Sequence, residues 1–308
     1  MKKDLLKMDD LSKEEILEIL NIADQLKYEL KHNMPHEHLK GKTLGMIFEK
    51  RSTRTRVSFE TGMYQLGGNA LFLSARDLQA ERGEAVEDTA RVLSRFLQGI
   101  MIRTFSQEEL ETFAKYATVP VINGLTDTEH PCQVLADLMT IREYKNILDG
   151  LNIAYIGDGH NMCNSLIIGC LKVGMNLSIA CPEGYHPSDS YINRGKEIAK
   201  KENVTFNVYS SPEEAVKNAD VVLTDMWISM GQEAEAEERK KAFKNFQVNN
   251  TLLELAKPNA LVLHCLPAHR GEEISAETFE EHSVEIFDES ENRLHVQKAV
   301  LLKLMKNN

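Results

Sequence analysis

Residues 43–73 read TLGMIFEKRSTRTRVSFETGMYQLGGNALFL and contain one complete folding unit. The apolar runs at residues 43–48 and 70–73 are typical of strands. A helix is predicted between them, from about Ser52 to the glycine pair at residues 67–68, because glycine readily takes the left-handed conformation that ends a helix. A strand, a helix and a strand in this order predict a βαβ unit with two parallel strands.

The same alternation of short apolar runs and longer amphipathic segments continues along the chain. Further strands are predicted at residues 99–102, 119–122, 151–156, 176–180, 204–208, 221–224 and 260–263. Helices are predicted after the capping box of Ser12 and Glu15, at about residues 131–148, and from about residue 292. The chain is therefore predicted to be an α/β protein with two doubly wound parallel-sheet domains and the active site in the cleft between them.

The expected domain boundaries follow from the grouping of these strands. We place the first domain at residues 1–134, completed by the C-terminal helix at about residues 292–308, and the second at residues 135–291. No Pro/Gly-rich linker separates the two series of strands, so the helix at about residues 131–148 is expected to join them.

Composition narrows the class of protein. The 308 residues are 42% hydrophobic and 27% charged, as in a globular protein, and the net charge of −11 argues against binding to a nucleic-acid backbone. No run of 18 apolar residues exists, so no membrane span is expected, and the first residues do not resemble a signal peptide. The five cysteines form no CxxC pair, which predicts a reduced, cytoplasmic protein without disulfides.

Four basic residues fall within residues 50–56, directly after the first predicted strand and at the start of its helix. Backbone N–H groups at a helix start, hydroxyls and guanidinium groups together suit a bound phosphate. The alternative is a capped helix whose charges are solvated. The hydroxyl-Arg-hydroxyl-Arg order of residues 53–56, after a strand and in an acidic chain, favours anion binding.

Three further polar residues of the first half are candidates for the same site. Arg103 follows the apolar run at residues 99–102, and ligands of open α/β sheets bind at the carboxyl ends of strands. His130 and Gln133 flank the start of a predicted helix and are placed to donate hydrogen bonds to one carbonyl oxygen. A surface salt bridge for Arg103 and a turn without function for His130 are the alternatives.

The second half carries candidates after two other strands. Gly157 and Gly159 resemble the start of a dinucleotide-binding fingerprint, but Met162 stands where the third glycine belongs, so no nicotinamide cofactor is expected. Asn161 in the same turn remains a polar ligand candidate. Asp225 follows the strand at residues 221–224, where it could bind a substrate ammonium or cap a helix.

His264 and Cys265 follow the strand at residues 260–263, and a Cys–His pair could indicate a nucleophile or a metal site. Adjacent residues of a strand point to opposite faces, so His264 is badly placed to activate Cys265. No second His/Cys cluster completes a zinc set, and we expect no metal. Taken alone, Cys265 also fits an inert core thiol.

Together and in this order, these segments resemble the aspartate/ornithine carbamoyltransferase family over nearly the whole chain. The resemblance rests on residues 52–60 (STRTRVSFE), on residues 130–133 (HPCQ) with 135–137 (LAD), and on residues 292–295 (NRLH). Residues 229–231 (SMG) and 264–267 (HCLP) are similar to the ornithine branch. The resemblance implies transfer of the carbamoyl group of carbamoyl phosphate to the side-chain amine of L-ornithine, which gives L-citrulline and phosphate in arginine metabolism, without a cofactor.

The resemblance also implies a role for each matching residue. The carbamoyl phosphate set it implies is Ser52, Thr53, Arg54, Thr55, Gln79, Arg103, His130, Gln133, Cys265, Leu266 and Arg293. The implied ornithine set is Asn161, Asp225, Ser229 and Met230. Arg54, Arg103, His130, Gln133 and Cys265 are the expected catalytic residues, and whether Cys265 takes a proton stays open.

The family resemblance implies a homo-oligomer, expected as a trimer, in which the loop around Gln79 reaches a neighbouring site. Residues 79–84 read QAERGE and depart from the usual family pattern, which leaves the loop conformation undetermined. Two other functions compete with the main interpretation. One is a non-catalytic binding protein with the same fold, and the other is a carbamoyltransferase for putrescine or an acylated ornithine. The Asp225 and Ser-Met-Gly set favours free ornithine.

Overall fold

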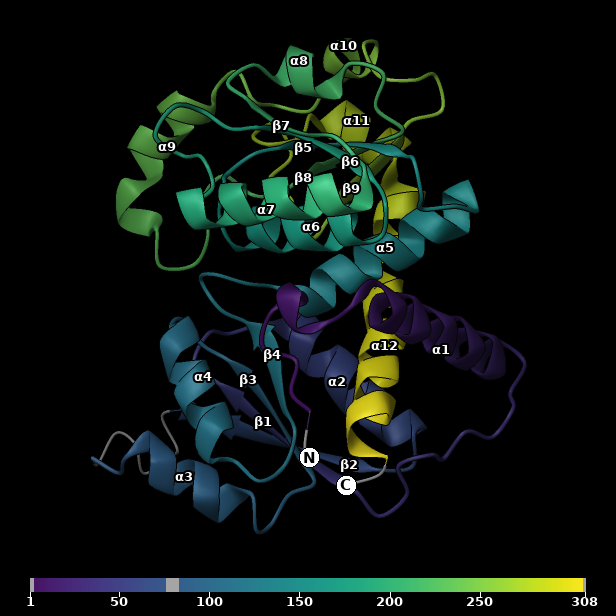
Figure 1. Ribbon diagram of the computed structural model, residues 1–308, viewed down its shortest axis with the longest axis vertical. Helices are drawn as coiled ribbons and strands as arrows, with labels where there is room; N and C mark the ends of the chain where they lie inside the picture. Colours follow the sequence, from purple (N-terminus) through teal and green to yellow (C-terminus); the bar gives the residue numbers. More distant parts are fainter. Residues whose placement is uncertain (1–2, 76–82, 307–308) are drawn as a thin grey trace. The chain divides into compact units, whose positions relative to one another are not determined.

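The computed structural model describes residues 3–75 and 83–306 and divides them into two compact units. One unit comprises residues 1–135 with 293–308, and the other comprises residues 136–292. The chain passes from one unit into the other within helix α5 (Pro131–Lys145) and within helix α12 (Ser283–Met305). Each unit has its own sheet (Figure 1). Each unit also has its own set of buried apolar side chains.

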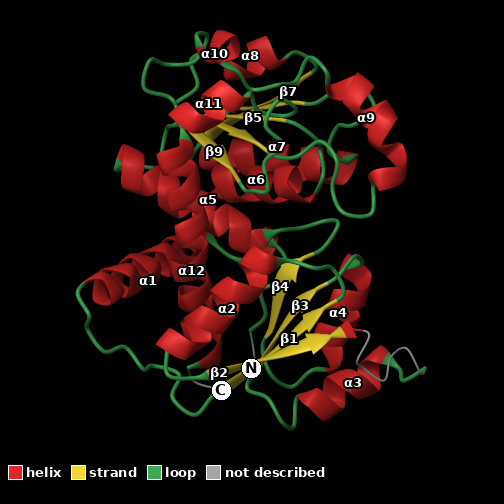
Figure 2. Cartoon of the chain, turned by 180° about the vertical axis from the view of Figure 1, so that it is seen from behind, coloured by secondary structure: helices red, strands yellow, loops and turns green. Residues whose placement is uncertain are grey.

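The first unit is built on a parallel sheet with the strand order β2-β1-β3-β4. Its strands are β1 (Thr43–Phe48), β2 (Asn69–Ser74), β3 (Gly99–Arg103) and β4 (Val121–Leu125). Its helices, besides its parts of α5 and α12, are η1 (Met8–Asp10), α1 (Lys13–Lys31), α2 (Thr53–Gln65), α3 (Val86–Leu93) and α4 (Gln107–Tyr116). Helices α3 and α4 cover one face of the sheet, and α2 and α12 lie on the other (Figures 1 and 2).

The second unit carries a parallel sheet with the order β7-β6-β5-β8-β9. Its strands are β5 (Asn152–Ile156), β6 (Asn176–Ala180), β7 (Phe206–Tyr209), β8 (Val221–Thr224) and β9 (Leu261–His264). Its remaining helices are α6 (Asn161–Lys172), α7 (Asp189–Glu202), α8 (Pro212–Val216), η4 (Glu233–Glu235), α9 (Ala236–Phe243), α10 (Asn250–Leu253) and α11 (Ala276–Glu281). Helices α6 and α7 cover one face, and α8, α10 and α11 lie over the other (Figure 2).

The predicted two-domain α/β architecture with parallel sheets is confirmed, and most predicted strands lie within two residues of the observed ones. The βαβ unit forms as predicted: Ser52 caps α2 by accepting the Thr55 N–H at 3.2 Å, and Gly67 has a φ of +77°. The C-terminal helix is a correction, because α12 begins at Ser283 and not near residue 292. Ile286 and Glu289 are buried in the additional turns, so the packing of these side chains accompanies the earlier start of the helix.

Two further findings concern the class of protein. All five cysteines carry free thiols. Among the helices that the structure describes, none is both long enough and apolar enough to span a bilayer.

Candidate functional site

Both sheets place candidate residues at the point where the strand order reverses. In the first sheet β2 and β3 flank β1, so the chain turns to opposite sides after β1 and β3. In the second sheet the same reversal occurs between β5 and β8. Ligands of open α/β sheets bind outside the carboxyl ends of such strand pairs. Residues 52–55 and Arg103 follow or end the first pair, and Asn161 and Asp225 follow the second.

In the first unit the hydroxyl of Thr55 is the centre of the arrangement. Thr55 is fully buried, and its Oγ1 lies 3.3 Å from Arg103 Nη1 and 2.9 Å from Arg293 Nη2, both donors. Ser52 Oγ lies 3.1 Å from the same oxygen. Three segments far apart in the sequence, namely the start of α2, the end of β3 and helix α12, therefore meet at one oxygen atom.

His130 and Gln133 lie at the start of α5, and both are buried. Burial lowers the pKa of His130 well below its ordinary value, and three nearby guanidinium charges lower it further. Those charges belong to Arg293, Arg103 and Arg54. The imidazole is therefore neutral near pH 7 and sits among concentrated positive charge, which is an environment suited to a bound dianion with a polar carbonyl.

The basic run at residues 50–56 divides into residues with different partners. Lys50 is buried against Asp127 and lies 4.3 Å from the centroid of the Phe105 ring. Arg56 pairs with Glu60 at 2.9 Å on the exposed side of α2. Within this run, the electrostatic effect on His130 is exerted by Arg54. The charge density of the sequence alone did not show this division.

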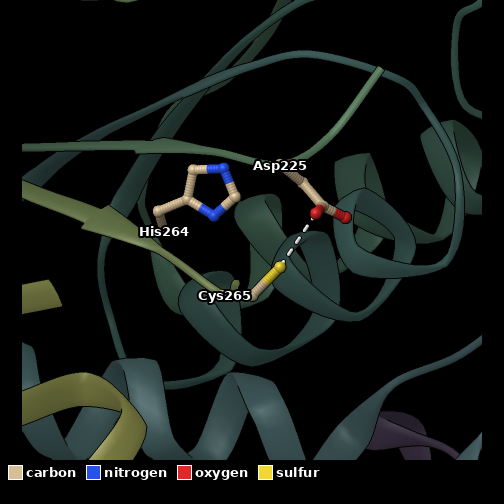
Figure 3. Close-up of side chains that lie close together, drawn as sticks. All are labelled: Asp225, His264 and Cys265. Atoms are coloured by element: carbon tan, nitrogen blue, oxygen red, sulfur yellow. Dashed lines mark hydrogen bonds between the residues drawn. The ribbon is translucent and has the colours of Figure 1, made fainter. Parts of the chain in front are cut away.

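In the second unit Cys265 and Asp225 come together from neighbouring strands. Cys265 Sγ donates to Asp225 Oδ1 at 2.9 Å (Figure 3). Burial, and next the negative charge of Asp225, raise the pKa of the Cys265 thiol well above its ordinary value. The thiol therefore keeps its proton at neutral pH and serves as a hydrogen-bond donor, which makes it unsuited to act as a thiolate base.

The other expected ornithine residues follow the carboxyl ends of β5 and β8. Asn161 is the first residue of α6 and is buried. Ser229 and Met230 lie in the segment after β8, where the Ser229 N–H donates to Gln232 at 2.9 Å and Met230 is 44% exposed. Gln79 lies outside the described residues, and Leu266 follows Cys265 directly in the loop after β9.

Sequence reasoning missed Arg239, which ties two of these segments together. Its buried guanidinium donates from Nε to the Trp227 carbonyl at 2.7 Å and pairs through Nη2 with Asp158. Trp227 lies between Asp225 and Ser229, while Asp158 is three residues before Asn161. The only sequence signal was a basic residue in a polar helix, because the partners are distant along the chain.

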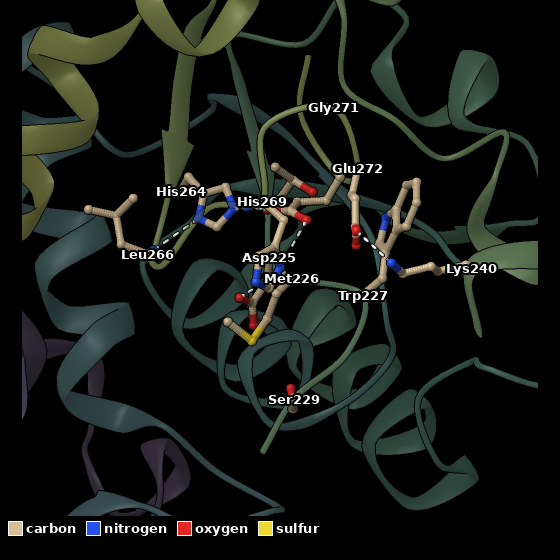
Figure 4. A network of polar contacts seen from close by, with 12 residues as sticks. Asp225, Met226, Trp227, Ser229, Lys240, His264, Leu266, His269, Gly271 and Glu272 are labelled. Atoms are coloured by element: carbon tan, nitrogen blue, oxygen red, sulfur yellow. Dashed lines mark hydrogen bonds and ion pairs between the residues drawn. The ribbon is translucent and has the colours of Figure 1, made fainter. Parts of the chain in front are cut away.

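Acidic, histidine and cysteine side chains gather at two places among the described residues. Asp225, His264 and Cys265 form one group, and His269, Glu272 and Glu273 form the other. In the first group both ring nitrogens of His264 already have protein partners, Glu273 at 3.0 Å and the Leu266 N–H at 2.9 Å. In the second, Glu272 is paired with Lys240 at 2.8 Å (Figure 4). These contacts indicate that His264 and Glu272 serve as hydrogen-bonding and ion-pairing groups within the protein.

Comparison with known proteins assigns the family. Residues 3–143 match the aspartate/ornithine carbamoyltransferase carbamoyl-P binding domain, and residues 149–304 match the Asp/Orn binding domain of the same family. The chain belongs to the aspartate/ornithine carbamoyltransferase family. The second match extends to residue 304, although residues 293–306 group with the first unit, because α12 contributes residues to both units.

Curated members of this family and solved structures resemble the chain over its length. An ornithine carbamoyltransferase of Methanosarcina mazei is 53% identical over 306 residues, which cover 99% of this chain and 100% of that protein. The structure of the Pyrococcus furiosus ornithine carbamoyltransferase has a TM-score of 0.95 at 51% identity and covers 99% of this chain and 97% of the other. The anabolic enzyme of Campylobacter jejuni has a TM-score of 0.94 at 45% identity, with 99% and 100% coverage.

Proposed function

We propose that the chain transfers the carbamoyl group of carbamoyl phosphate to the side-chain amine of L-ornithine, giving L-citrulline and phosphate. The observation that carries this proposal is the convergence of Arg103 and Arg293 on Thr55 Oγ1 at the switch point of the first sheet. The relatives named above, each an ornithine carbamoyltransferase, support the choice of ornithine as acceptor.

The first unit supplies groups suited to the donor substrate. Ser52, Thr53, Arg54 and Thr55 would hold the phosphate through the start of α2, where backbone N–H groups and the helix dipole favour an anion. His130 and Gln133, with Arg103, would surround the carbonyl group, and Arg293 would add charge from α12. Negative charge grows on the carbonyl oxygen and on the departing phosphate, so fixed cationic donors lower the barrier.

The second unit supplies groups suited to the amino acid. Asp225 would bind the α-ammonium group, with Asn161, Ser229 and Met230 around the rest of the backbone of ornithine. Cys265, as a protonated thiol, would hold the Asp225 carboxylate in place and contact the bound substrates with Leu266. The two sets of residues would then serve the two substrates of one reaction.

The acceptor must lose a proton before it attacks. An alkylammonium resembles lysine, with a pKa of about 10.4, so the neutral amine at pH 7.5 costs about 4 kcal/mol. Exclusion of water destabilises the charged form and offsets part of this cost. The protonated Cys265 thiol does not take this proton in our account.

We further propose a cytoplasmic enzyme of arginine biosynthesis that assembles as a homotrimer. Support for assembly comes from large apolar side chains that stay exposed on the first unit: Val57, Tyr64, Leu71, Phe72 and Phe96. Sedimentation equilibrium should give three times the chain mass of 34.9 kDa. A single species at the mass of one chain across working concentrations would refute the assembly.

The proposed reaction is tested by a product assay. Purified protein with carbamoyl phosphate should form citrulline from ornithine and far less product from putrescine or N-acetylornithine. Faster carbamoylation of either alternative amine would reassign the acceptor, and no turnover with any of them would favour a binding protein.

A further inference from the structure

His264, the last residue of β9, holds the loop that follows it. Its side chain is buried, and its Nδ1 accepts the backbone N–H of Leu266 at 2.9 Å (Figure 4). Nδ1 can accept only when it carries no proton, so the ring proton lies on Nε2. Nε2 then donates to Glu273 Oε1, 3.0 Å away. The imidazole is thereby fixed in one neutral tautomer between Leu266 and Glu273.

Glu273 closes this arrangement from the other end of the loop. It is fully buried, and the same Oε1 accepts the backbone N–H of His269 at 2.5 Å. The backbone returns on itself here, since the Gly271 N–H donates to the Ile274 carbonyl at 2.8 Å. One carboxylate oxygen therefore binds both the start and the middle of the segment from residue 264 to residue 273.

The residue held by His264 has an unusual backbone conformation. Leu266 has a φ of +56°, which lies in the left-handed region that side chains other than glycine rarely adopt. Such a conformation persists only where neighbouring groups enforce it, and the bond from the Leu266 N–H to His264 does so directly. Cys265 lies between these two residues, and its thiol reaches Asp225 at 2.9 Å. The orientation of Cys265 therefore depends on the His264 contact.

We propose that His264 and Glu273 are positioning residues for the transfer reaction, with Glu273 orienting His264 and His264 setting the conformation of Cys265 and Leu266 beside Asp225. The inference rests on the proposed function and deepens it. Neither side chain touches a substrate in this account. Loss of these hydrogen bonds would displace the Cys265 thiol, weaken its hold on Asp225 and so reduce use of ornithine.

Three variants distinguish the role of the Glu273 acceptor oxygen from that of its negative charge and from that of a neighbouring carboxylate. Glu273→Gln keeps an acceptor oxygen for both N–H groups and removes the charge, whereas Glu273→Leu removes the acceptor at similar size. Glu272→Gln is the matched control, because the neighbouring Glu272 pairs with Lys240 and has no bond to His264. We expect Glu273→Leu to lower kcat/KM for ornithine at least tenfold. Glu273→Gln and Glu272→Gln should stay within threefold of the parent.

A second readout follows the loop without any turnover. Cys265 is the half-buried cysteine, and the other four are buried, so a thiol reagent such as Ellman's reagent reports on it selectively. Glu273→Leu should speed modification of one thiol at least fivefold, and that fast phase should vanish in Glu273→Leu combined with Cys265→Ala. An absence of citrulline formation in the parent would refute the proposed function, whereas an unchanged thiol rate would refute the positioning role by itself.

The tautomer of His264 can be tested in the parent protein. Long-range proton–nitrogen NMR of histidine rings at pH 7.5 should show His264 with its proton on Nε2, assigned by its loss in His264→Asn. A doubly protonated ring, or a proton on Nδ1, would contradict the hydrogen bonds that we assign to His264 with Leu266 and Glu273. The proposal would also be refuted if Glu273→Gln lowered kcat/KM as much as Glu273→Leu does. The loss of activity would then not come from removal of the acceptor oxygen.

Discussion

Replacing Thr55 by valine tests the centre of the phosphate arrangement with little change in shape. Valine has nearly the same volume as threonine but lacks the Oγ1 to which Arg293 donates at 2.9 Å and Arg103 at 3.3 Å. A hydrogen bond with a charged partner contributes about 1.5–3 kcal/mol. We assign about 2 kcal/mol to the shorter bond and treat the longer bond as weak.

The lost bond also removes the group that fixes two guanidinium donors, so we expect its free energy to appear in ligand affinity. At about 1.4 kcal/mol per tenfold, 2 kcal/mol raises the dissociation constant of carbamoyl phosphate about 30-fold. Isothermal titration measures this constant directly, and thermal unfolding checks that the variant is folded. Thr55→Ser keeps the hydroxyl and is the matched control, expected within threefold of the parent. If Thr55→Val binds as tightly as Thr55→Ser, the hydroxyl is not the organising centre.

Three other predictions concern single residues, and a fourth concerns metal ions. Arg54→Ala should weaken carbamoyl phosphate binding more than tenfold in a calorimetric titration, since it removes a permanent charge that matches phosphate; a change below threefold would refute the assignment. Asp225→Asn should weaken binding of norvaline, an ornithine analogue without the reacting amine, to the carbamoyl phosphate-loaded protein by at least tenfold and leave carbamoyl phosphate affinity unchanged; equal norvaline binding would make Asp225 a structural cap. The pKa of His130 is lowered in the folded protein, so the unfolded chain binds the extra proton first as the pH falls. The free energy of unfolding should therefore decrease below about pH 6.5 by up to ~1.4 kcal/mol per pH unit. His130→Gln should reduce that slope in urea titrations, and an identical slope would contradict the lowered pKa. Exhaustive chelation and dialysis should leave full turnover, and loss of activity that only one divalent ion restores would show that a metal is required.

Local patterns predicted the features of the fold and site that depend on short stretches of chain. The βαβ unit, the cap at Ser52 and the place of Arg103 at a strand end all follow from signals within a few residues. The start of the C-terminal helix was predicted too late, near residue 292, whereas α12 begins at Ser283 and buries Ile286 and Glu289 in its first turns. In these turns tertiary packing decided the structure over local preference.

Contacts between distant segments could not be predicted in the same way. Arg239 reaches Asp158 across 81 residues, and no spacing in the chain connects them. Glu273 lies nine residues after His264, yet the pairing depends on how the loop folds back after Gly271. The family resemblance named the residues expected to touch substrates, whereas the contacts of Arg239 with Asp158 and of Glu273 with His264 became visible only in the structure.

The most direct test of the account is a comparison of initial rates with three acceptors at a fixed concentration of carbamoyl phosphate. We predict citrulline formation from ornithine with kcat/KM at least 100-fold above the values for putrescine and N-acetylornithine. The reason is that Asp225 and the segment around Ser229 would bind the free α-amino and α-carboxylate groups that those two amines lack or block. Comparable rates with putrescine, or no citrulline at all, would contradict the central claim.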